Sequence, residues 1–275
     1  MRTESDLDAE APGDGGVGTV ALAISHPGHE LRLAAWIARA RPTISILTAG
    51  SRNGEGRARV GASRRLAEQL NATPGRLFGD HLDRDVYAWI MAGETQGFVR
   101  LADDLADDFV RQGVRTVVTD SWQLYNVTHD LWHLTVRRAA SLASQRLGWP
   151  IDCLDYEVVP RGMAARAVGP LRYRRKLTPS QVEAKLRMAA EYPEIADEVS
   201  SLLKLGETEF LASESLHEVR PLEDLVPTPD EAPLYERSGE DRVAAGLYPS
   251  VLRWRHVEPI VHALEPALRE RPSAA

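Results

Sequence analysis

The stretch VGTVALAISHPGHELRLAAWIARARPTISILTAG, residues 17–50, determines the fold class that the sequence predicts. Its first part, residues 17–25, is an apolar run that ends at a His-Pro-Gly turn, which is typical of a buried strand. Residues 30–40 then carry apolar side chains at helical spacing, and Pro42 ends this pattern before a second apolar run at 43–50. The predicted order is strand, helix, strand.

The same alternation continues along the chain. We expect helices around Leu66 and Leu70, at 83–91, at 98–110 and at 128–147, and buried strands at 114–120 and 151–159. Continuous apolar strands that alternate with helices are typical of a mostly parallel sheet covered on both faces. The sequence therefore predicts an α/β fold, a Rossmann-like three-layer sandwich that binds its ligand beyond the carboxyl ends of the strands.

The chain changes character after Pro160. Residues 172–176 are strongly basic and favour a solvated loop, although they could also grip an anionic part of a substrate. The sequence Thr178-Pro179-Ser180-Gln181 predicts a helix start with a capping box. The helical segment is expected to continue with interruptions to about residue 216, followed by a Pro- and acid-rich linker and a closing segment at 245–268.

Three regions follow from this pattern. Residues 1–16 have five acidic side chains and almost no bulky apolar ones, which predicts a disordered acidic tail. Residues 17–160 form the Rossmann-like core that carries the site. Residues 161–275 form a mainly helical region packed on the core. This region could wall the pocket and set specificity, with Glu214, Arg220 or Tyr235 as unranked candidates for that role.

Composition restricts the classes of function. The formal net charge is -7, with no broad excess of Lys or Arg, so nucleic-acid binding has little support. The sequence has neither a secretory signal nor a run of about 18 apolar residues, so we expect a soluble, cytoplasmic protein without stable membrane insertion. A single cysteine, Cys153, fits a reducing compartment and lies in an apolar run that favours a buried structural role. A homo-oligomer is left open.

Two histidine clusters carry the chemical signal. His26 and His29 lie in Ser-His-Pro-Gly-His-Glu, directly after the first strand, and His129 and His133 lie one helical turn apart after the strand at 114–120. Solvent-exposed turn residues or packing on an amphipathic helix would be the ordinary interpretation of either cluster alone, above all for His133. The predicted fold brings both to the same end of one sheet, which favours a divalent-metal site.

At these residues the chain resembles the PIG-L/LmbE-like family of zinc-dependent N-deacetylases. That family has His-Pro-Asp-Asp-Glu after the first strand, a Thr-Gly-type strand end followed by an Arg-bearing helix, and a late His-Pro-Asp-His. The counterparts here are residues 26–30, residues 47–50 with Arg57 or Arg59 beyond, and residues 126–129. The resemblance covers residues 19–160.

The resemblance implies Zn²⁺ or another divalent metal bound by His26, His29 and His129, with His29 in place of an aspartate. Three protein ligands and an open water position are the usual catalytic zinc arrangement. Two positions depart from the family. Gly28 stands where the general base belongs, and Asn126 stands where a histidine belongs.

Surrogates for these groups are available nearby. Asn126 could donate a hydrogen bond to an oxyanion, and Glu30 or Asp130 could replace the base; alternatively, Gly28 could open room for a different substrate group. Arg57 and Arg59 are candidates for binding a phosphate or carboxylate of the substrate, although an exposed charged loop is the plainer interpretation.

The resemblance therefore implies a metal-dependent hydrolase of the N-deacetylase type, acting on an N-acylated amino sugar or glycoconjugate. Two alternatives remain open. One is a non-hydrolytic metal- or sugar-binding relative that lost the general base, and the other is a metal-dependent C–N cleaving enzyme of secondary metabolism.

Overall fold

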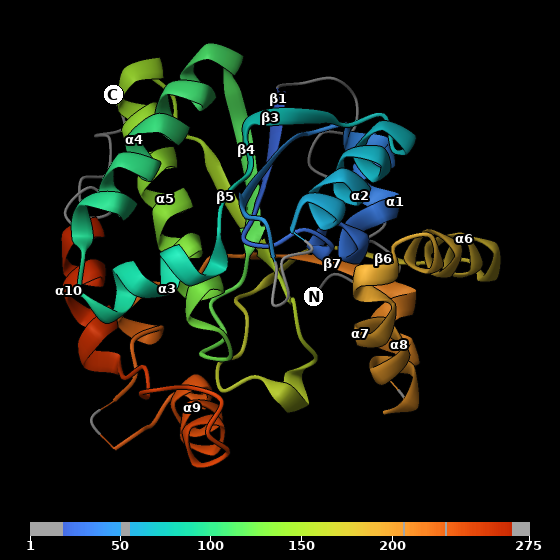
Figure 1. The fold of residues 1–275 in the computed structure, drawn as a ribbon. Helices are drawn as coiled ribbons and strands as arrows, with labels where there is room; N and C mark the ends of the chain where they lie inside the picture. The colour runs from blue at the N-terminus through green and yellow to red at the C-terminus, as the bar shows by residue number, and fades with distance from the viewer. Residues whose placement is uncertain (1–18, 51–55, 206, 229, 266–275) are drawn as a thin grey trace.

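The computed structural model describes residues 19–50, 56–205, 207–228 and 230–265. Within these residues a seven-stranded sheet carries helices on both of its faces (Figure 1). This is the three-layer α/β sandwich that the apolar strands predict. The expected acidic tail, residues 1–16, lies outside the described residues.

The sheet has the strand order β3-β2-β1-β4-β5-β7-β6. Strands β1 to β5 are parallel, whereas β7 pairs antiparallel with β5 and with β6. Chain connections leave β1 and β4 toward opposite sides, which opens a crevice at the carboxyl ends of these two neighbours. The strands are β1 (Thr19–Ile24), β2 (Thr43–Thr48), β3 (Thr73–His81), β4 (Val114–Asp120), β5 (Asp152–Tyr156), β6 (Leu171–Lys176) and β7 (Ser213–Glu218).

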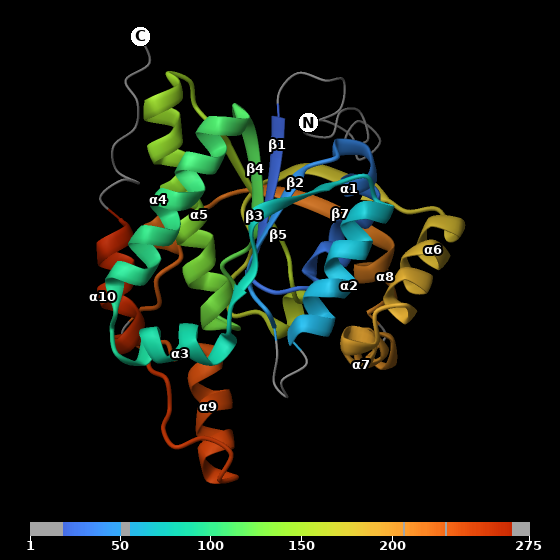
Figure 2. The same ribbon diagram turned by 45° about the horizontal axis from the view of Figure 1, so that its top comes forward.

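Each face of the sheet packs against its own set of helices (Figure 2). One face is covered by α3 (Asp83–Met91), α4 (Thr95–Gln112), α5 (Val127–Leu147) and α10 (Trp254–Leu264). The other face is covered by α1 (Ala34–Ala40), α2 (Gly56–Gln69), α6 (Pro179–Ala190) and α7 (Pro193–Lys204). The remaining elements are short: α8 (Thr208–Ala212), α9 (Leu234–Ala244) and the 3-10 turns η2 (His29–Leu33), η3 (Arg161–Met163) and η4 (Leu222–Asp224).

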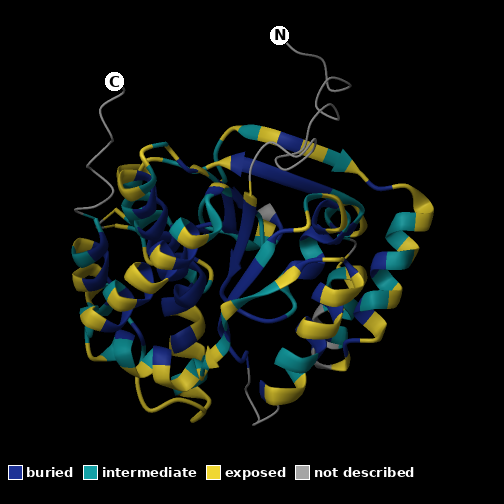
Figure 3. Ribbon diagram, turned by 90° about the horizontal axis from the view of Figure 1, so that it is seen from above, coloured by how far each residue is buried: buried dark blue, intermediate teal, exposed yellow. Residues whose placement is uncertain are grey.

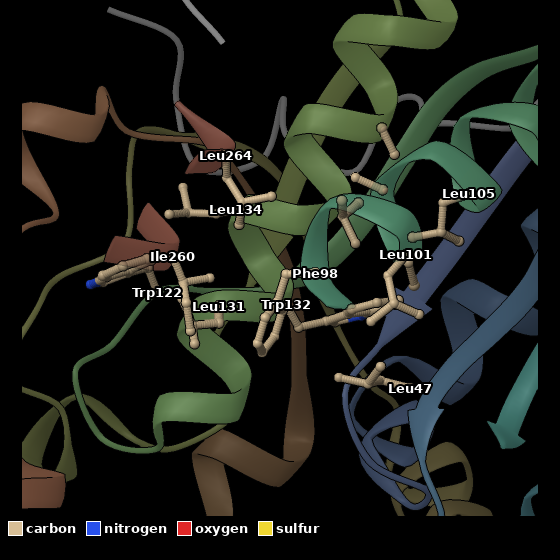
Figure 4. Close-up of a cluster of buried hydrophobic side chains, with 14 of the residues drawn as sticks. Leu47, Phe98, Leu101, Leu105, Trp122, Leu131, Trp132, Leu134, Ile260 and Leu264 are labelled. Carbon is tan, nitrogen blue, oxygen red and sulfur yellow. The ribbon is translucent and has the colours of Figure 1, made fainter. Parts of the chain in front are cut away.

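The core lies between the sheet and these helices. The central strands are buried along their length, while the outer faces of the helices are exposed (Figure 3). On the α5 side, Phe98, Trp132 and Leu131 belong to one large apolar cluster (Figure 4). Burial of such side chains contributes about 1.5–3 kcal/mol each, which holds the strand ends that position the site. No helix in the described part of the chain has both the length and the apolar character needed to cross a bilayer.

The region after residue 160 differs from the expectation. The predicted loop at 172–176 is part of edge strand β6, and the helical segment expected to reach 216 gives way to β7 at Ser213. Charged side chains are typical of edge strands, because they discourage pairing with another chain. In β7 the buried positions include Glu214 and His217, so the apolar alternation that marks a strand is absent.

Two further elements were not anticipated. Strand β3 contains Pro74 and two glycines and is half-exposed at the sheet edge, so it has no apolar alternation. Helix α9 follows the predicted linker. By contrast, the capping box at Thr178 and Gln181 is confirmed, with Pro179 in the first turn of α6.

Candidate functional site

The histidines from the two sequence clusters lie together in the crevice between β1 and β4. His26 and His29 follow β1, and His129 lies in the first turn of α5. The ring centres are 5.4 Å apart for His26 and His29, 5.1 Å for His26 and His129, and 4.7 Å for His29 and His129. Three imidazoles from two distant segments therefore lie in mutual edge contact.

Asp120, the last residue of β4, holds the first histidine turn. Its Oδ2 accepts hydrogen bonds from the backbone N–H of Ser25, at 2.8 Å, and from the Ser25 hydroxyl, while Oδ1 accepts one from the Tyr156 hydroxyl at 2.7 Å. Nδ1 of His29 is 3.2 Å from Oδ2. Burial alone would raise the pKa of Asp120, but the charge and hydrogen bond of His29, with smaller contributions from His129 and Ser25, place it well below its usual range. The carboxylate is therefore charged and fixes the orientation of His29.

His26 is held in a similar way from the other side. Its Nδ1 is 2.7 Å from the hydroxyl of Thr48, the last residue of β2, and 3.4 Å from Oδ1 of Asp83. Burial would raise the pKa of Asp83, but the hydrogen bond and charge of His26 outweigh it and the pKa is lowered. Carboxylates behind metal-binding histidines commonly fix the ring and its tautomer in this manner.

His129 is buried against the other two rings. No hydrogen bond joins its ring to another described residue, and its contacts are with the imidazoles of His26 and His29. Burial, followed by the charges of His29 and His26, holds its pKa well below the ordinary value. A neutral imidazole is the form of histidine that binds a metal ion.

The three residues fit a divalent metal in their chemistry and their spacing. Imidazoles that bind one tetrahedral zinc through nitrogens at about 2.0–2.1 Å have ring centres about 5 Å apart. The observed separations of 4.7–5.4 Å agree with this spacing. The donor atoms are not yet aimed at one point, however, because among the described residues no three His, Cys, Asp or Glu side chains have the geometry of a formed metal site.

Asn126 lies next to the histidines, at the N-cap of α5. Its Oδ1 accepts the backbone N–H of Thr128 at 2.9 Å. Because an amide side chain has one oxygen and one NH₂ group, the NH₂ group is left to donate elsewhere. Asn126 lines the cavity beside the histidines.

Glu30 lies behind the turn and does not line the cavity. It is 1% exposed, its Oε2 accepts the backbone N–H of Gly28 at 2.8 Å, and its Oε1 accepts the hydroxyl of Ser63. Burial raises the pKa of Glu30. Its contacts fix the shape of the turn between His26 and His29.

Gly28 has a left-handed backbone with φ of 103°, and it is tightly covered. A Cβ atom at this position would lie 2.8 Å from Cγ2 of Ile195 on α7. The space that a side chain at position 28 would need is thus filled by an apolar side chain. The glycine does not open additional room for substrate at this point.

Asp130 and His133 also lie behind the site rather than on the cavity. Oδ1 of Asp130 accepts the backbone N–H groups of Gln123 at 2.9 Å and Leu124 at 3.2 Å, and burial raises its pKa to about 8. The His133 ring is fully buried and its Nδ1 donates to the carbonyl oxygen of Asp120 at 2.9 Å. Both side chains support the loop that joins β4 to α5.

The two candidate arginines have different positions. Arg59 lines the cavity, and its guanidinium donates to the carbonyls of Pro27 and Gly50, each at 2.9 Å. It therefore ties the loop after β1 to the loop after β2. Arg57 is exposed on α2 and does not line the cavity. Cys153 on β5 is partly exposed, and burial raises the pKa of its thiol to about 12; the structural role stays a prediction.

A cavity of about 690 Å³ opens beside the three histidines. Its polar end is formed by the histidines together with Asp83, Asn126 and Arg59, and its far end by side chains of α6, α7 and α8. Residues after position 160 are therefore part of the cavity lining, although the candidates Glu214, Arg220 and Tyr235 are not among them.

Sequence reasoning did not single out Asp120, Asp83 or Thr48. Each lies at the end of a strand or the start of a helix, and at such places an acid or a threonine is also common as a cap. The available signal was positional. Asp120 and Thr48 end two strands that the sequence predicts and that lie on either side of β1, and His81, two residues before Asp83, ends a strand that the sequence did not reveal.

The chain was compared with known proteins. No protein-family model matches it, and no relative is found among curated proteins. Among solved structures, the A40926 pseudoaglycone deacetylase Dbv21 has a TM-score of 0.48 and 16% identity, covering 77% of this chain and 99% of that one. A deacetylase of teicoplanin biosynthesis has a TM-score of 0.46 and 17% identity, covering 64% and 85%.

A third similar structure has another activity. The 4-carboxy-2-hydroxymuconate hydratase GalB from Pseudomonas putida has a TM-score of 0.45 and 18% identity, covering 78% of this chain and 100% of that one. All three TM-scores are below 0.5, and the identities are low. These likenesses assign neither a family nor an activity to the chain.

Proposed function

We propose that this protein is a divalent-metal-dependent amide hydrolase of the N-deacetylase type, acting on an N-acylated amino sugar or glycoconjugate. The observation that carries the proposal is the close packing of the His26, His29 and His129 rings at the polar end of a cavity. The reaction type comes from the resemblance of the His-Pro-Gly-His-Glu turn to the motif of zinc-dependent deacetylases.

Each residue at the polar end has a role in this proposal. His26, His29 and His129 would hold Zn²⁺, which when bound polarises the amide carbonyl and lowers the pKa of water. Asp120 orients His29, and Asp83 with Thr48 orients His26. The Asn126 NH₂ group donates to the oxyanion that develops on the carbonyl oxygen.

Three acids near the histidines are candidates for the proton acceptor. Glu30 and Asp130 stay predictions in that role; their contacts support a positioning role, because both bind backbone N–H groups behind the cavity. Among the described residues that line the cavity, Asp83 is the one acid. Each of Glu30, Asp130 and Asp83 is replaced singly by its amide, and the rate of amine release by each variant is measured as a function of pH. The variant that loses the rise in rate with increasing pH identifies the proton acceptor.

The first experiment measures metal content and amine release on the same preparation. We expect close to one zinc per chain, with release of free amine from N-acylated glucosamines. The His26→Ala and His129→Ala variants should lose the metal and at least about 100-fold in activity, since general metal and acid-base assistance is typically worth this much or more. His262→Ala, on the exposed face of α10, is the matched control.

The outcomes separate the proposal from its alternatives. A protein that binds no metal, and whose His26→Ala variant is indistinguishable, contradicts the metal site. Metal binding without amine release from any acylated sugar favours the non-hydrolytic binding protein. Cleavage of a C–N bond in a substrate without an acyl group favours the third alternative. The similar solved structures include deacetylases and a hydratase, so the fold does not choose among these.

A further inference from the structure

We propose that the far end of the cavity binds a linear hydrocarbon chain, so that the substrate amide carries a medium- or long-chain acyl group rather than acetyl. The inference rests on the proposed hydrolysis for the position of the amide at the histidines. It adds the chemical class of the acyl group, which neither the motifs nor the metal site specifies.

The lining contributed by α6, α7 and α8 is mainly hydrocarbon. Helices α6, α7 and α8 contribute Leu186, Ala189, Ile195, Val199, Leu202 and Leu211 to it. The segment after β5 contributes further apolar side chains at positions 158, 159 and 163. Ser201 of α7 also lines the cavity. These helices thus present a mainly apolar wall to the cavity, whereas charged residues elsewhere on them are exposed, namely Glu183, Arg187, Lys204 and Glu209.

The cationic side chains of Lys185 and Arg32 line this part of the cavity, but their charged groups already have partners within the protein. Nζ of Lys185 is 2.8 Å from Oε1 of Glu214 and donates to the carbonyl of Arg32 at 3.0 Å. The Arg32 guanidinium lies 3.5 Å from the centre of the Phe210 ring, and its Nε donates to the carbonyl of Glu157 at 3.2 Å. The methylene stems of both side chains therefore add to the apolar surface.

This chemistry discriminates between ligands. A sugar hydroxyl placed against the wall would lose its hydrogen bonds to water without gaining matching partners, which is unfavourable. A methylene group placed there is removed from water at no such cost. The sugar of an N-acylated amino sugar is accordingly expected at the polar rim, next to Arg59, Tyr125 and Asn126, and the acyl chain along the helices.

The apolar wall begins directly at the metal-site turn. Ile195 covers Gly28, with its Cγ2 2.8 Å from where a Cβ would stand. A carbonyl at the histidines therefore has hydrocarbon immediately beside it. At the other end the lining reaches Leu205, which is 66% exposed, so the cavity opens to solvent near the C-terminal end of α7. A chain of many carbons fits this path, and an acetyl group would leave most of the 690 Å³ empty.

The test compares N-acetyl-, N-hexanoyl- and N-decanoyl-glucosamine. Affinity is measured by calorimetry on the zinc-loaded protein, and amine release is measured in parallel. Each methylene that is fully buried should tighten binding about fourfold. Because burial of the last carbons is partial, we expect N-decanoyl-glucosamine to bind at least about 100-fold more tightly than N-acetyl-glucosamine.

Variants of the wall locate the effect. Leu202→Asn should weaken binding of the decanoyl probe about tenfold and leave the acetyl probe unchanged. Leu203→Asn is the matched control, because the neighbouring leucine is 41% exposed and does not line the cavity. Val199→Phe, which fills the groove without adding a polar group, should act like Leu202→Asn and serves if that variant does not fold.

The two readouts keep the inference distinct from the proposed function. Equal affinity for all three probes, or equal effects of Leu202→Asn and Leu203→Asn, overturns the acyl-chain site even if N-acetyl-glucosamine is hydrolysed. Chain-length-dependent binding that Leu202→Asn abolishes supports the site even if no amine is released, and in that case the hydrolase proposal fails alone.

Discussion

The two ends of the cavity are built on different physical principles. At the histidine end, buried polar groups are held by hydrogen bonds from strand ends, as when Asp120 binds Ser25, Tyr156 and His29. At the helical end, apolar side chains of α6 and α7 form a wall whose charged groups bind only protein. The sheet thus fixes the positions of the polar site residues. In our proposal, the helices added to it determine which substrates fit.

The largest expected effect is a loss of stability at the ion pair that is buried beneath helix α6. Lys185 and Glu214 are each no more than 5% exposed, and Glu214 also accepts the backbone N–H of Trp36 at 2.8 Å. Lys185→Met leaves the carboxylate buried without its cation and should lower the free energy of unfolding by about 3–5 kcal/mol. Urea denaturation measures the loss, and Lys204→Met, at an exposed position of α7, should cost less than about 0.5 kcal/mol. Equal losses would show that the buried pair contributes nothing special.

A smaller loss of stability is expected at Gly28, where the histidine end of the cavity meets the apolar wall. Gly28→Asp restores the residue type of the resembled family, but it requires φ of 103° from a residue with a Cβ and presses that atom against Ile195. We expect a loss of about 2–4 kcal/mol in unfolding free energy and no gain in hydrolysis.

Two companion variants separate the causes of this loss. Gly113 also has a positive φ, of 62°, but nothing lies within 4 Å of its Cβ position. Gly113→Asp therefore reports backbone strain alone and should cost about 1–2 kcal/mol. Adding Ile195→Ala to Gly28→Asp should recover activity only if an aspartate here can act as the base. A stable, faster Gly28→Asp single variant would contradict the tight packing at this junction.

The smallest effect concerns the orientation of one histidine. Asp120→Asn keeps the shape of the side chain but removes the charge that faces Nδ1 of His29. Zinc affinity should fall about 10–100-fold, measured by competition with a chelator, because partners behind a ligand usually have this influence. Asp107→Asn, at a half-exposed pair with Arg146, should leave zinc affinity unchanged. Unchanged affinity in Asp120→Asn would argue that His29 is not a ligand.

The sequence predicted the fold of the core and the meeting of the histidines for one reason. Residues 19–24 and 114–120 are rich in apolar and β-branched side chains and are mostly buried, and a parallel sheet brings their carboxyl ends together with whatever follows them. The positions of His26, His29 and His129 follow from that rule.

The remaining features of the fold and the site depend on contacts between residues far apart in the chain, which no local sequence pattern indicates. Strand β7 is hidden because Glu214 and His217 are polar and buried, each with partners from distant segments. The cover of Gly28 by Ile195 joins residues far apart in the chain. The sequence could therefore identify a missing base at Gly28, but not the helix that fills its place.

The apolar wall formed by α6, α7 and α8 is, in chain order, the connection between two neighbouring strands of the sheet. Strands β6 and β7 are adjacent and antiparallel, with Lys176 paired to Ser213, and the N–H of Leu177 donates to the carbonyl of Ala212 at 2.8 Å. Everything that forms the apolar wall on α6, α7 and α8 is thus inserted between two neighbouring backbone positions, like the tip of a hairpin. Such an insertion can be lengthened, shortened or exchanged without moving a strand of the sheet. A segment of this kind can change the chemistry of the proposed acyl site while the three histidines keep their places at the strand ends.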